Sequence, residues 1–383
     1  MALELYRSVA AGKRLPAYVR TARRRLGPIN LEELDTHELW ALHDAGARGH
    51  PSTDSGPSLL DLKIELAERM LGECRLCEHQ CGVDRRGGEA GICGVGTNSR
   101  YFFEQIIWGE EAPLNPSHEV FFSGCNMRCK FCYSWETILD PGRGMPVLPE
   151  EFGRLIGRRR QEGALNVNLI GGEPTVHLPS ILRSLGFIDS PTAVVWNSNF
   201  LMSQHTVRLL NGIVDLYVGD FRFGNDACAQ AVAGTDGYFE AAARNFRLAA
   251  GTGDVIVRHL VLPGHVDCCL RPIAEWMAEN LPETPFNLMF QYMPFYEALN
   301  DPMLCRSLTP QEECDARRLV LSLGLNISRW NRPLPQGTER REVGSGEIST
   351  TIIVRPDGRV AVMHLHSQLM NLARALKSGG DTK

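Results

Sequence analysis

Short apolar runs alternate with amphipathic segments through the middle of the chain. The runs are bounded by turn residues, which is typical of buried strands, and the segments between them repeat apolar residues at helical spacing. Because strands and helices alternate, we expect right-handed crossovers and a parallel sheet. The expected strands are residues 119–122, 165–170, 193–196, 213–218, 255–262 and 287–292, and the expected helices are 149–160, 178–185, 204–210, 238–250 and 271–280.

This alternation predicts an α/β fold, a partial and open (βα)6 barrel over residues 118–300. Helical patterns at 31–47 and 58–71 predict a helical N-terminal extension at 1–72. A C-terminal extension at 301–383 is expected to contain a helix at 309–323, a Pro/Gly-rich linker at 330–346, a β-hairpin with strands at 348–353 and 360–363, and a terminal helix from about Ser367.

Three cysteines, Cys125, Cys129 and Cys132, follow the first predicted strand with the spacing C-x3-C-x2-C. Three thiolates of one loop can ligate three irons of a [4Fe-4S] cluster and leave the fourth iron open to a chelating molecule. Structural zinc normally has four protein ligands, so a zinc site here would need a distant fourth residue. The spacing therefore favours an iron-sulfur cluster.

A second group of cysteines lies in a glycine-rich segment at 73–117, with Cys74, Cys77, Cys81 and Cys93 spaced by two, three and eleven residues. Four ligands fit a second [4Fe-4S] cluster or a tetrahedral zinc ion, and the sequence leaves both open. With no open iron, such a site would serve structure or electron transfer. The remaining cysteines are expected mainly as small apolar core residues, with weak potential for redox or ligand chemistry at the adjacent pair: Cys228, Cys268, Cys269, Cys305 and Cys314.

The composition argues against several classes of partner. The chain has 383 residues, 43% of them hydrophobic, and 40 basic against 45 acidic residues give a formal charge of -5, so nucleic acid and anionic membranes are not expected partners. No stretch approaches the roughly 20 apolar residues that cross a bilayer, and no secretion signal is found. The clustered cysteines then favour metal ligation in a reducing, cytoplasmic compartment over disulfides.

The cysteine loop resembles that of the radical S-adenosylmethionine (SAM) superfamily, with Phe131 at the aromatic position before the last cysteine, where the resemblance implies a contact with the cofactor. Gly171, Gly172 and Glu173 follow the second predicted strand, where that superfamily has its GGE motif. The resemblance implies the partial barrel, a [4Fe-4S] cluster and SAM bound at its open iron. It also implies that Gly172 and Glu173 meet the methionyl ammonium, which a carboxylate suits and which adjacent glycines allow to approach closely.

Later segments resemble the activases of glycyl-radical enzymes and the pyruvate formate-lyase activating-enzyme-like branch. This narrower resemblance implies that Asn197 and Asn199 lie near the SAM ribose and that Arg258 pairs with the SAM carboxylate. Asp220 and Arg222 match an Asp-x-Lys segment and are expected to shape the catalytic, substrate side of the site, although they also fit an ion pair that stabilises a loop.

The resemblance implies an enzyme that reductively cleaves SAM to a 5′-deoxyadenosyl radical, with electrons from a carrier such as flavodoxin or ferredoxin. That radical would abstract hydrogen from a metabolite or peptide. One alternative is an activase that installs a glycyl radical on a partner protein, and another is a non-catalytic iron-sulfur electron-transfer or scaffold protein. Asn197 and Met293 stand where activases have an acid and a histidine, and the chain continues well beyond the barrel, so we favour the first reading.

Overall fold

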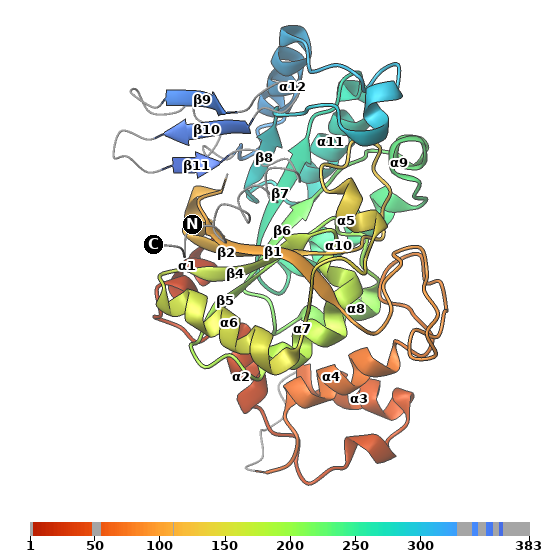
Figure 1. Ribbon diagram of the computed structural model, residues 1–383, viewed down its shortest axis with the longest axis vertical. Helices are drawn as coiled ribbons and strands as arrows, with labels where there is room; N and C mark the ends of the chain where they lie inside the picture. The colour runs from red at the N-terminus through yellow and green to blue at the C-terminus, as the bar shows by residue number, and fades with distance from the viewer. Residues whose placement is uncertain are drawn as a thin grey trace, which may run out of the picture.

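An open, mostly parallel sheet with helices around it forms the centre of the computed structural model (Figure 1), which describes residues 3–47, 55–109 and 111–327 and three further strands near the C-terminus. The sheet has eight strands in the order β3-β1-β2-β4-β5-β6-β7-β8, so β3 and β8 are its two edges. This confirms the predicted α/β fold with a partial barrel. Six strands run parallel: β2 Ser117–Phe122, β4 Asn166–Gly171, β5 Ala193–Ser198, β6 Leu216–Asp220, β7 Asp254–Leu260 and β8 Phe286–Met289.

The crossover helices lie where the sequence predicts them: α6 Pro149–Gln161, α7 Leu178–Leu185, α8 Gln204–Leu210, α10 Tyr238–Ala250 and α11 Arg271–Asn280. Local signals explain why their ends were predictable. The Ser203 side chain accepts a hydrogen bond from the Thr206 amide at the start of α8, and prolines occupy the first turns of α6, α7 and α11.

Several elements were not expected. Strand β1 Arg100–Ile107 pairs antiparallel with β2, and the two-residue strand β3 Met145–Pro146 pairs with β1. The burial of β1 does not alternate regularly, so the sequence offers no clear period of two. Short helices also add to the prediction, namely α5 Trp135–Leu139, α9 Asp226–Ala233, and the turns η2 Ala112–Leu114, η3 Pro174–His177, η4 Val266–Leu270 and η5 Tyr296–Asn300.

The first helix, α1 Glu4–Ala10, covers the end of the barrel opposite to the cysteine loop. Its Tyr6 belongs to a buried apolar cluster with residues of the strands, including Val195 and Val218. The Tyr6 hydroxyl accepts a hydrogen bond of 2.7 Å from Asn166 Nδ2, and the Tyr6 amide donates to Asp254 at 2.7 Å. Because Asn166 and Asp254 begin β4 and β7, α1 closes the amino ends of the strands.

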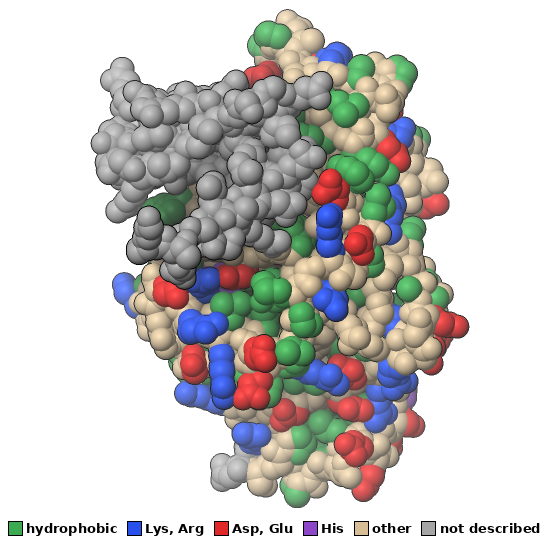
Figure 2. All heavy atoms as spheres, viewed as in Figure 1, with side chains coloured by type: hydrophobic (Ala, Val, Ile, Leu, Met, Phe, Trp, Pro, Cys, Tyr) green, Lys and Arg blue, Asp and Glu red, His purple; other side chains and the backbone are tan. Residues whose placement is uncertain are grey.

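The rest of the N-terminal extension packs on the outside of the barrel. The predicted helices appear as α3 Thr36–Ala47, preceded by η1 Leu31–Glu33, and as α4 Leu59–Arg69. Helix α4 contacts α2 Ala17–Arg23, α3, α7 and α8, and these helices lie below the sheet in Figure 1. Acidic and basic side chains are interspersed over the face of the molecule that Figure 2 draws.

Beyond the barrel, α12 Pro310–Ser322 confirms the helix predicted at 309–323, with Thr309 and Glu312 forming its capping box. A three-stranded antiparallel sheet follows, made of β9 Glu339–Val343, β10 Thr350–Val354 and β11 Val360–Val362. Strands β10 and β11 are the predicted hairpin, whereas β9 falls in a segment expected to be a linker. The terminal helix expected from about Ser367 lies outside the described residues. No helix in the described part of the chain is long and apolar enough to cross a membrane.

Candidate functional site

The three-cysteine loop lies at the carboxyl edge of the sheet, directly after β2. Cys125 and Cys129 are buried and Cys132 is half-buried. The Arg128 amide donates to Ala233 O at 3.0 Å and the Lys130 amide donates to Val232 O at 2.8 Å, so the end of α9 holds the loop. These backbone hydrogen bonds therefore fix the cysteine loop to the rest of the barrel.

The thiols of this loop suit a cluster better than a single ion. Burial raises the pKa of Cys125, Cys129 and Cys132, and for Cys125 the charges of Glu173 and the other two thiols raise it further. Because burial disfavours the charged form, thiolates in this loop need a bound cationic group to stabilise them. At least two of the three sulfur atoms are more than 4.8 Å apart. Around one zinc ion, Zn–S bonds of about 2.3 Å would place them roughly 3.8 Å apart, so the observed spacing is wider than a single zinc ion requires.

Gly171 and Gly172 bring the end of β4 against the cysteine loop. Gly171 has a φ of +112°, and a Cβ on Gly172 would lie 1.9 Å from Gly124 O. The Glu173 amide donates to the same oxygen at 3.1 Å. The sequence predicts that these glycines let the backbone approach a ligand. The structure shows that they let β4 approach the loop that carries the cysteines.

The Glu173 carboxylate is fully buried and holds two loops together. Its Oε1 accepts from the Thr175 amide and hydroxyl and from Ser198 Oγ at 2.8 Å, and its Oε2 accepts from the Asn199 amide at 2.9 Å. Burial raises the pKa of Glu173 despite these bonds. With three bonds on Oε1 and one on Oε2, only Oε2 has clear capacity for a further donor.

Arg258, the expected partner of the SAM carboxylate, is held by protein groups. Its Nε donates to Asp220 Oδ1 at 2.8 Å, one terminal nitrogen donates to Asn197 Oδ1 at 2.7 Å, and Glu111 lies 3.8 Å from the other. Because two carboxylates surround this guanidinium, its charge is already balanced. The Asn197 side chain faces the barrel interior, but its Oδ1 already accepts this hydrogen bond from Arg258.

Arg222 pairs with Asp220, as expected for an ion pair that stabilises a loop. Burial alone would raise the pKa of Asp220, but Arg222 and Arg258 outweigh it and lower that pKa. Burial raises the pKa of Cys129, and the Arg222 charge partly offsets this rise, so the guanidinium lies in the same buried region as the thiol. The Arg222 Nε is buried without a hydrogen-bond partner among the described residues. A buried donor of this kind suits an anionic ligand.

Phe131 and Asn199 stabilise the loop from within. Phe131 is buried and packs edge-on against Tyr292, with 5.8 Å between ring centroids. Asn199 Nδ2 donates to Asn126 Oδ1 at 2.7 Å and lies 3.8 Å from Cys125 Sγ, while its Oδ1 accepts from the Leu201 amide. Both side chains therefore have protein partners at the positions where the resemblance implied cofactor contacts.

The second group of cysteines packs against the first. Cys74, Cys77 and Cys93 are buried and Cys81 is exposed. The charges of Cys93 and Cys74 contribute to the raised pKa of both Cys77 and Cys81, after burial, so the four thiols share one region. No three of their sulfur atoms lie within 4.8 Å of one another, which is wider than a single zinc ion requires.

The sequence did not single out two further residues: Asn126, which connects the two groups, and Arg85, which lies beside the second group. Asn126 is fully buried, accepts from Asn199, and donates to Leu201 O at 3.2 Å, while its backbone oxygen lies 2.6 Å from His79 Nε2. Arg85 is buried with a terminal nitrogen 4.0 Å from Cys74 Sγ. Their position within the two cysteine segments was the available signal.

The five remaining cysteines correct the prediction that they are mainly core residues. Cys305 and Cys314 are exposed. The sulfur atoms of Cys228, Cys268 and Cys269 lie together, although Cys228 is 40 positions from the adjacent pair in the sequence. Such a convergence follows from tertiary structure and leaves no pattern in the sequence.

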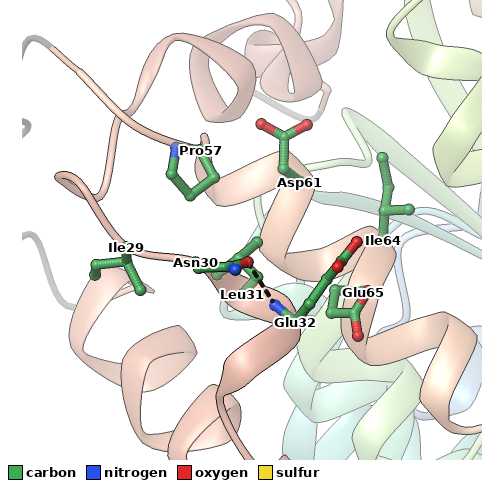
Figure 3. Close-up of a pocket in the computed structure, with 8 residues that line it drawn as sticks. All are labelled: Ile29, Asn30, Leu31, Glu32, Pro57, Asp61, Ile64 and Glu65. Carbon is green, nitrogen blue, oxygen red and sulfur yellow. Dashed lines mark hydrogen bonds between the residues drawn. The ribbon is translucent and has the colours of Figure 1, made fainter.

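The protein also has a groove that lies away from both groups of cysteines. It has a volume of about 320 Å³ and lies in the N-terminal extension (Figure 3), lined by Ile29, Asn30, Leu31, Glu32, Pro57, Asp61, Ile64 and Glu65. Asn30 Oδ1 there accepts from the Glu32 amide at 3.2 Å, as a helix cap. None of the lining residues belongs to the cysteine segments.

Comparison with known proteins agrees with the fold and the cysteine loop. Residues 120–277 match the family model described as "Radical SAM superfamily". Residues 120–277 are therefore a radical SAM domain, and the enzymes of that superfamily use a [4Fe-4S] cluster and SAM.

Among individual proteins, "Uncharacterized protein MJ0674" of Methanocaldococcus jannaschii is 38% identical over 316 residues, which are 78% of this chain and 92% of that protein. Streptococcus suis SuiB bound to precursor peptide SuiA is 15% identical with a TM-score of 0.38, over 52% of this chain and 43% of SuiB. The structure titled "Native anSMEcpe with bound AdoMet" is 14% identical with a TM-score of 0.41, over 54% of this chain and 60% of that one. This chain thus spans less than half of SuiB.

Proposed function

We propose that this radical SAM enzyme reductively cleaves SAM and uses the resulting 5′-deoxyadenosyl radical to abstract hydrogen from a metabolite or peptide. The main support is the loop of Cys125, Cys129 and Cys132 at the carboxyl edge of the sheet, together with Arg222, whose buried Nε has no hydrogen-bond partner among the described residues and could meet an anion. When bound, the cluster and SAM supply the difficult redox chemistry. The protein supplies binding, orientation and exclusion of water.

Arg222, rather than Arg258, is our candidate for the SAM carboxylate. Its buried Nε has no partner among the described residues, whereas Arg258 is surrounded by Asp220 and Glu111. Arg258 then acts as a positioning residue, because it fixes Asp220, which in turn holds Arg222. Glu173 is also a positioning residue in this proposal, and its Oε2 is the atom that would accept from the methionyl ammonium.

The substrate side of the proposed site is the polar interior of the barrel. Asn168 lies on the same face of β4 as Asn166 and is buried with its Oδ1 lacking a hydrogen-bond partner among the described residues. Asn197 on β5 and Asp220 on β6 come from neighbouring strands. A substrate with hydrogen-bond donors would satisfy Asn168 Oδ1 there.

For the second group of cysteines we propose a [4Fe-4S] cluster that passes electrons towards the first. Two observations support it: the wide spacing of the sulfur atoms, and the contact between the segments, where His79 Nε2 lies 2.6 Å from Asn126 O. An electron carrier such as flavodoxin or ferredoxin would dock near the exposed Cys81. Reconstituted protein should then contain roughly eight iron atoms per chain, and a Cys125→Ala/Cys129→Ala/Cys132→Ala variant roughly four.

Cleavage of SAM is the direct test of the proposed function. Anaerobically reconstituted protein is given SAM and dithionite, and 5′-deoxyadenosine is quantified by mass spectrometry. We expect product from the intact protein and from a Cys305→Ala/Cys314→Ala control, whose cysteines are exposed, and none from the Cys125→Ala/Cys129→Ala/Cys132→Ala variant. Failure of the intact protein to form product, with its cluster present and SAM bound, would favour the non-catalytic electron-transfer or scaffold alternative.

A glycyl-radical activase is the second candidate function. It is favoured by the open sheet, whose edges β3 and β8 do not pair with each other and would leave a lateral path for a protein loop. An activase would generate a glycyl radical on a partner protein, detectable by electron paramagnetic resonance after mixing with cell extract and SAM. A doublet that depends on Cys129 would select the activase over the metabolite or peptide enzyme.

A further inference from the structure

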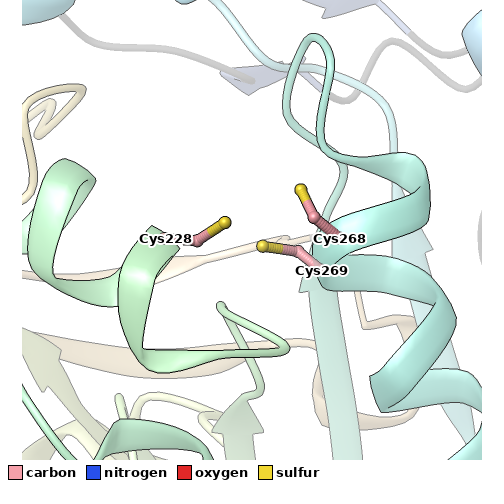
Figure 4. Close-up of side chains that lie close together, drawn as sticks. All are labelled: Cys228, Cys268 and Cys269. Atoms are coloured by element: carbon pink, nitrogen blue, oxygen red, sulfur yellow. The ribbon is translucent and has the colours of Figure 1, made fainter.

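Three cysteines from two elements converge near the barrel mouth, apart from both groups already described. Cys228 lies on α9, and Cys268 and Cys269 lie on η4, and all three sulfur atoms are within 4.8 Å of one another. Figure 4 shows the three side chains pointing into the gap between the two elements. Among the described residues, this is the one set of three or more potential ligands gathered so closely.

The backbone of η4 accounts for two adjacent cysteines facing the same point. His265 O accepts from the Cys269 amide at 3.0 Å and from the Leu270 amide at 3.2 Å, the second being the wider turn of a π-helix. Such single π-turns are rare and frequently occur at functional sites. Close packing holds the segment just before α9 against this turn, because a Cβ on Gly224 would lie 2.5 Å from Cys269 O.

Asn225 organises the surroundings of the three sulfur atoms. Its Nδ2 lies 3.3 Å from Cys228 Sγ and donates to Cys268 O at 2.7 Å, and its Oδ1 accepts from the Cys228 amide at 2.8 Å. One side chain thus ties the two elements together and points a donor at a sulfur atom. A donor in this position stabilises a thiolate, and second-sphere contacts of this kind orient metal ligands.

We propose that Cys228, Cys268 and Cys269 bind one zinc ion. Zn–S bonds of about 2.3 Å place tetrahedral ligands roughly 3.8 Å apart, which lies within the observed limit, whereas the two other cysteine groups are spaced more widely. Thiolates are the soft ligands that select zinc. Cys228 and Cys268 are half-buried, so the fourth position faces solvent and can take a water molecule.

The zinc ion would stabilise the wall behind the cluster loop. The last turn of α9 accepts hydrogen bonds from Arg128 and Lys130 of that loop, and Cys228 lies near the start of the same helix. A metal that joins α9 to η4 therefore fixes one support of the loop. Zinc binding releases the three thiol protons and involves no oxidation or reduction. The inference does not depend on the proposed function.

The test compares zinc content and cobalt spectra of full-length, anaerobically reconstituted protein. We expect one more zinc ion per chain in the wild type and in a Cys305→Ser control than in Cys228→Ser and Cys268→Ser variants. After removal of zinc by a chelator, Co²⁺ should give sulfur-to-cobalt charge-transfer absorption that Zn²⁺ displaces and that both variants lack. Cys305 is an exposed cysteine outside the group and controls for the loss of a thiol.

Two results would overturn the zinc assignment. Equal zinc content in Cys228→Ser, Cys268→Ser and Cys305→Ser proteins, each with an intact circular dichroism spectrum, would remove this site. A disulfide between Cys228 and either partner in zinc-free protein purified anaerobically, identified by mass spectrometry of alkylated peptides, would assign the cysteines to redox chemistry instead. The circular dichroism spectrum separates a lost site from a lost fold.

Discussion

Arg222 and Arg258 both pair with Asp220, but their other surroundings differ. Arg258 contacts Asp220, Asn197 and Glu111 from three other segments, so protein groups already surround its charge. Arg222 has one carboxylate partner and a buried Nε without a partner in the described structure. Both arginines were recognisable in the sequence as candidates. Which of them is available to a ligand depends on residues far away in the sequence, such as Glu111, and could not be predicted.

Replacing Arg222 should therefore weaken SAM binding more than it weakens the fold. Hydrogen bonds to charged groups contribute about 1.5–3 kcal/mol, so we expect Arg222→Gln to raise the Kd for SAM by roughly 10- to 100-fold and Arg222→Lys to restore part of it. Equilibrium dialysis of radiolabelled SAM against reconstituted protein measures this. Arg258→Gln is the comparison, and it should mainly lower the melting temperature. An unchanged Kd in Arg222→Gln would refute the assignment.

Lys63 is a second buried charge, in the N-terminal extension. Its Nζ lies 2.9 Å from His43 Nε2 and donates to Leu209 O at 3.1 Å and Arg208 O at 3.3 Å. Burial, followed by the nearby Arg208 charge, lowers the pKa of Lys63 from 10.5 to about 7. Between these two values the unfolded chain binds one more proton than the folded protein, so the contribution of Lys63 to stability rises with pH.

We predict that the melting temperature of the wild type, relative to Lys63→Met, increases from pH 7 to pH 9. The slope of this difference should approach about 1.4 kcal/mol per pH unit when converted to free energy. Differential scanning calorimetry of both proteins at pH 7, 8 and 9 measures it, and the comparison cancels titrating groups that the two proteins share. A difference that stays constant or falls with rising pH would contradict the lowered pKa.

Among the elements, those with local signals were predictable and those stabilised by remote partners were not. Helices α7, α8 and α11 begin and end where the sequence indicated, because their caps and prolines are local. Strand β1 depends on pairing with β2 and on β3 nearly forty residues later. Helix α9 is short and rich in alanine, and its place behind the cluster loop is a tertiary contact.

The approach of β4 to the cluster loop gives a prediction at this scale. A Cβ on Gly172 would lie 1.9 Å from Gly124 O, so Gly172→Ala must separate the two backbones. We expect this variant to lose most of the iron held by the first cysteine group while it keeps its helical circular dichroism signal. The control is Gly186→Ala, because a Cβ there meets its nearest atom at 3.7 Å. Equal iron content in both variants would show that the contact is dispensable.

Across the whole molecule, the two ends of the barrel differ, because a helix covers one end and the cysteine segments lie at the other. Helix α1 covers the amino ends of the strands through Tyr6. The carboxyl ends carry the cluster loop, with the second cysteine segment packed against it. The barrel could be predicted from the sequence because hydrophobic periodicity is local, and the spacing of the two cysteine groups is visible in the sequence for the same reason. The hydrogen-bond partners of Glu173 and Asn199 could not be predicted, because they come from different strands.

The most direct test of this account is electron paramagnetic resonance of the dithionite-reduced, reconstituted protein with and without SAM. We predict a [4Fe-4S]⁺ signal that changes when SAM is added, because Cys125, Cys129 and Cys132 leave one iron open. In the Cys125→Ala/Cys129→Ala/Cys132→Ala variant, any remaining signal should not respond to SAM. A wild-type signal that SAM leaves unchanged, or a SAM response that survives in the triple variant, would contradict the assignment of this loop.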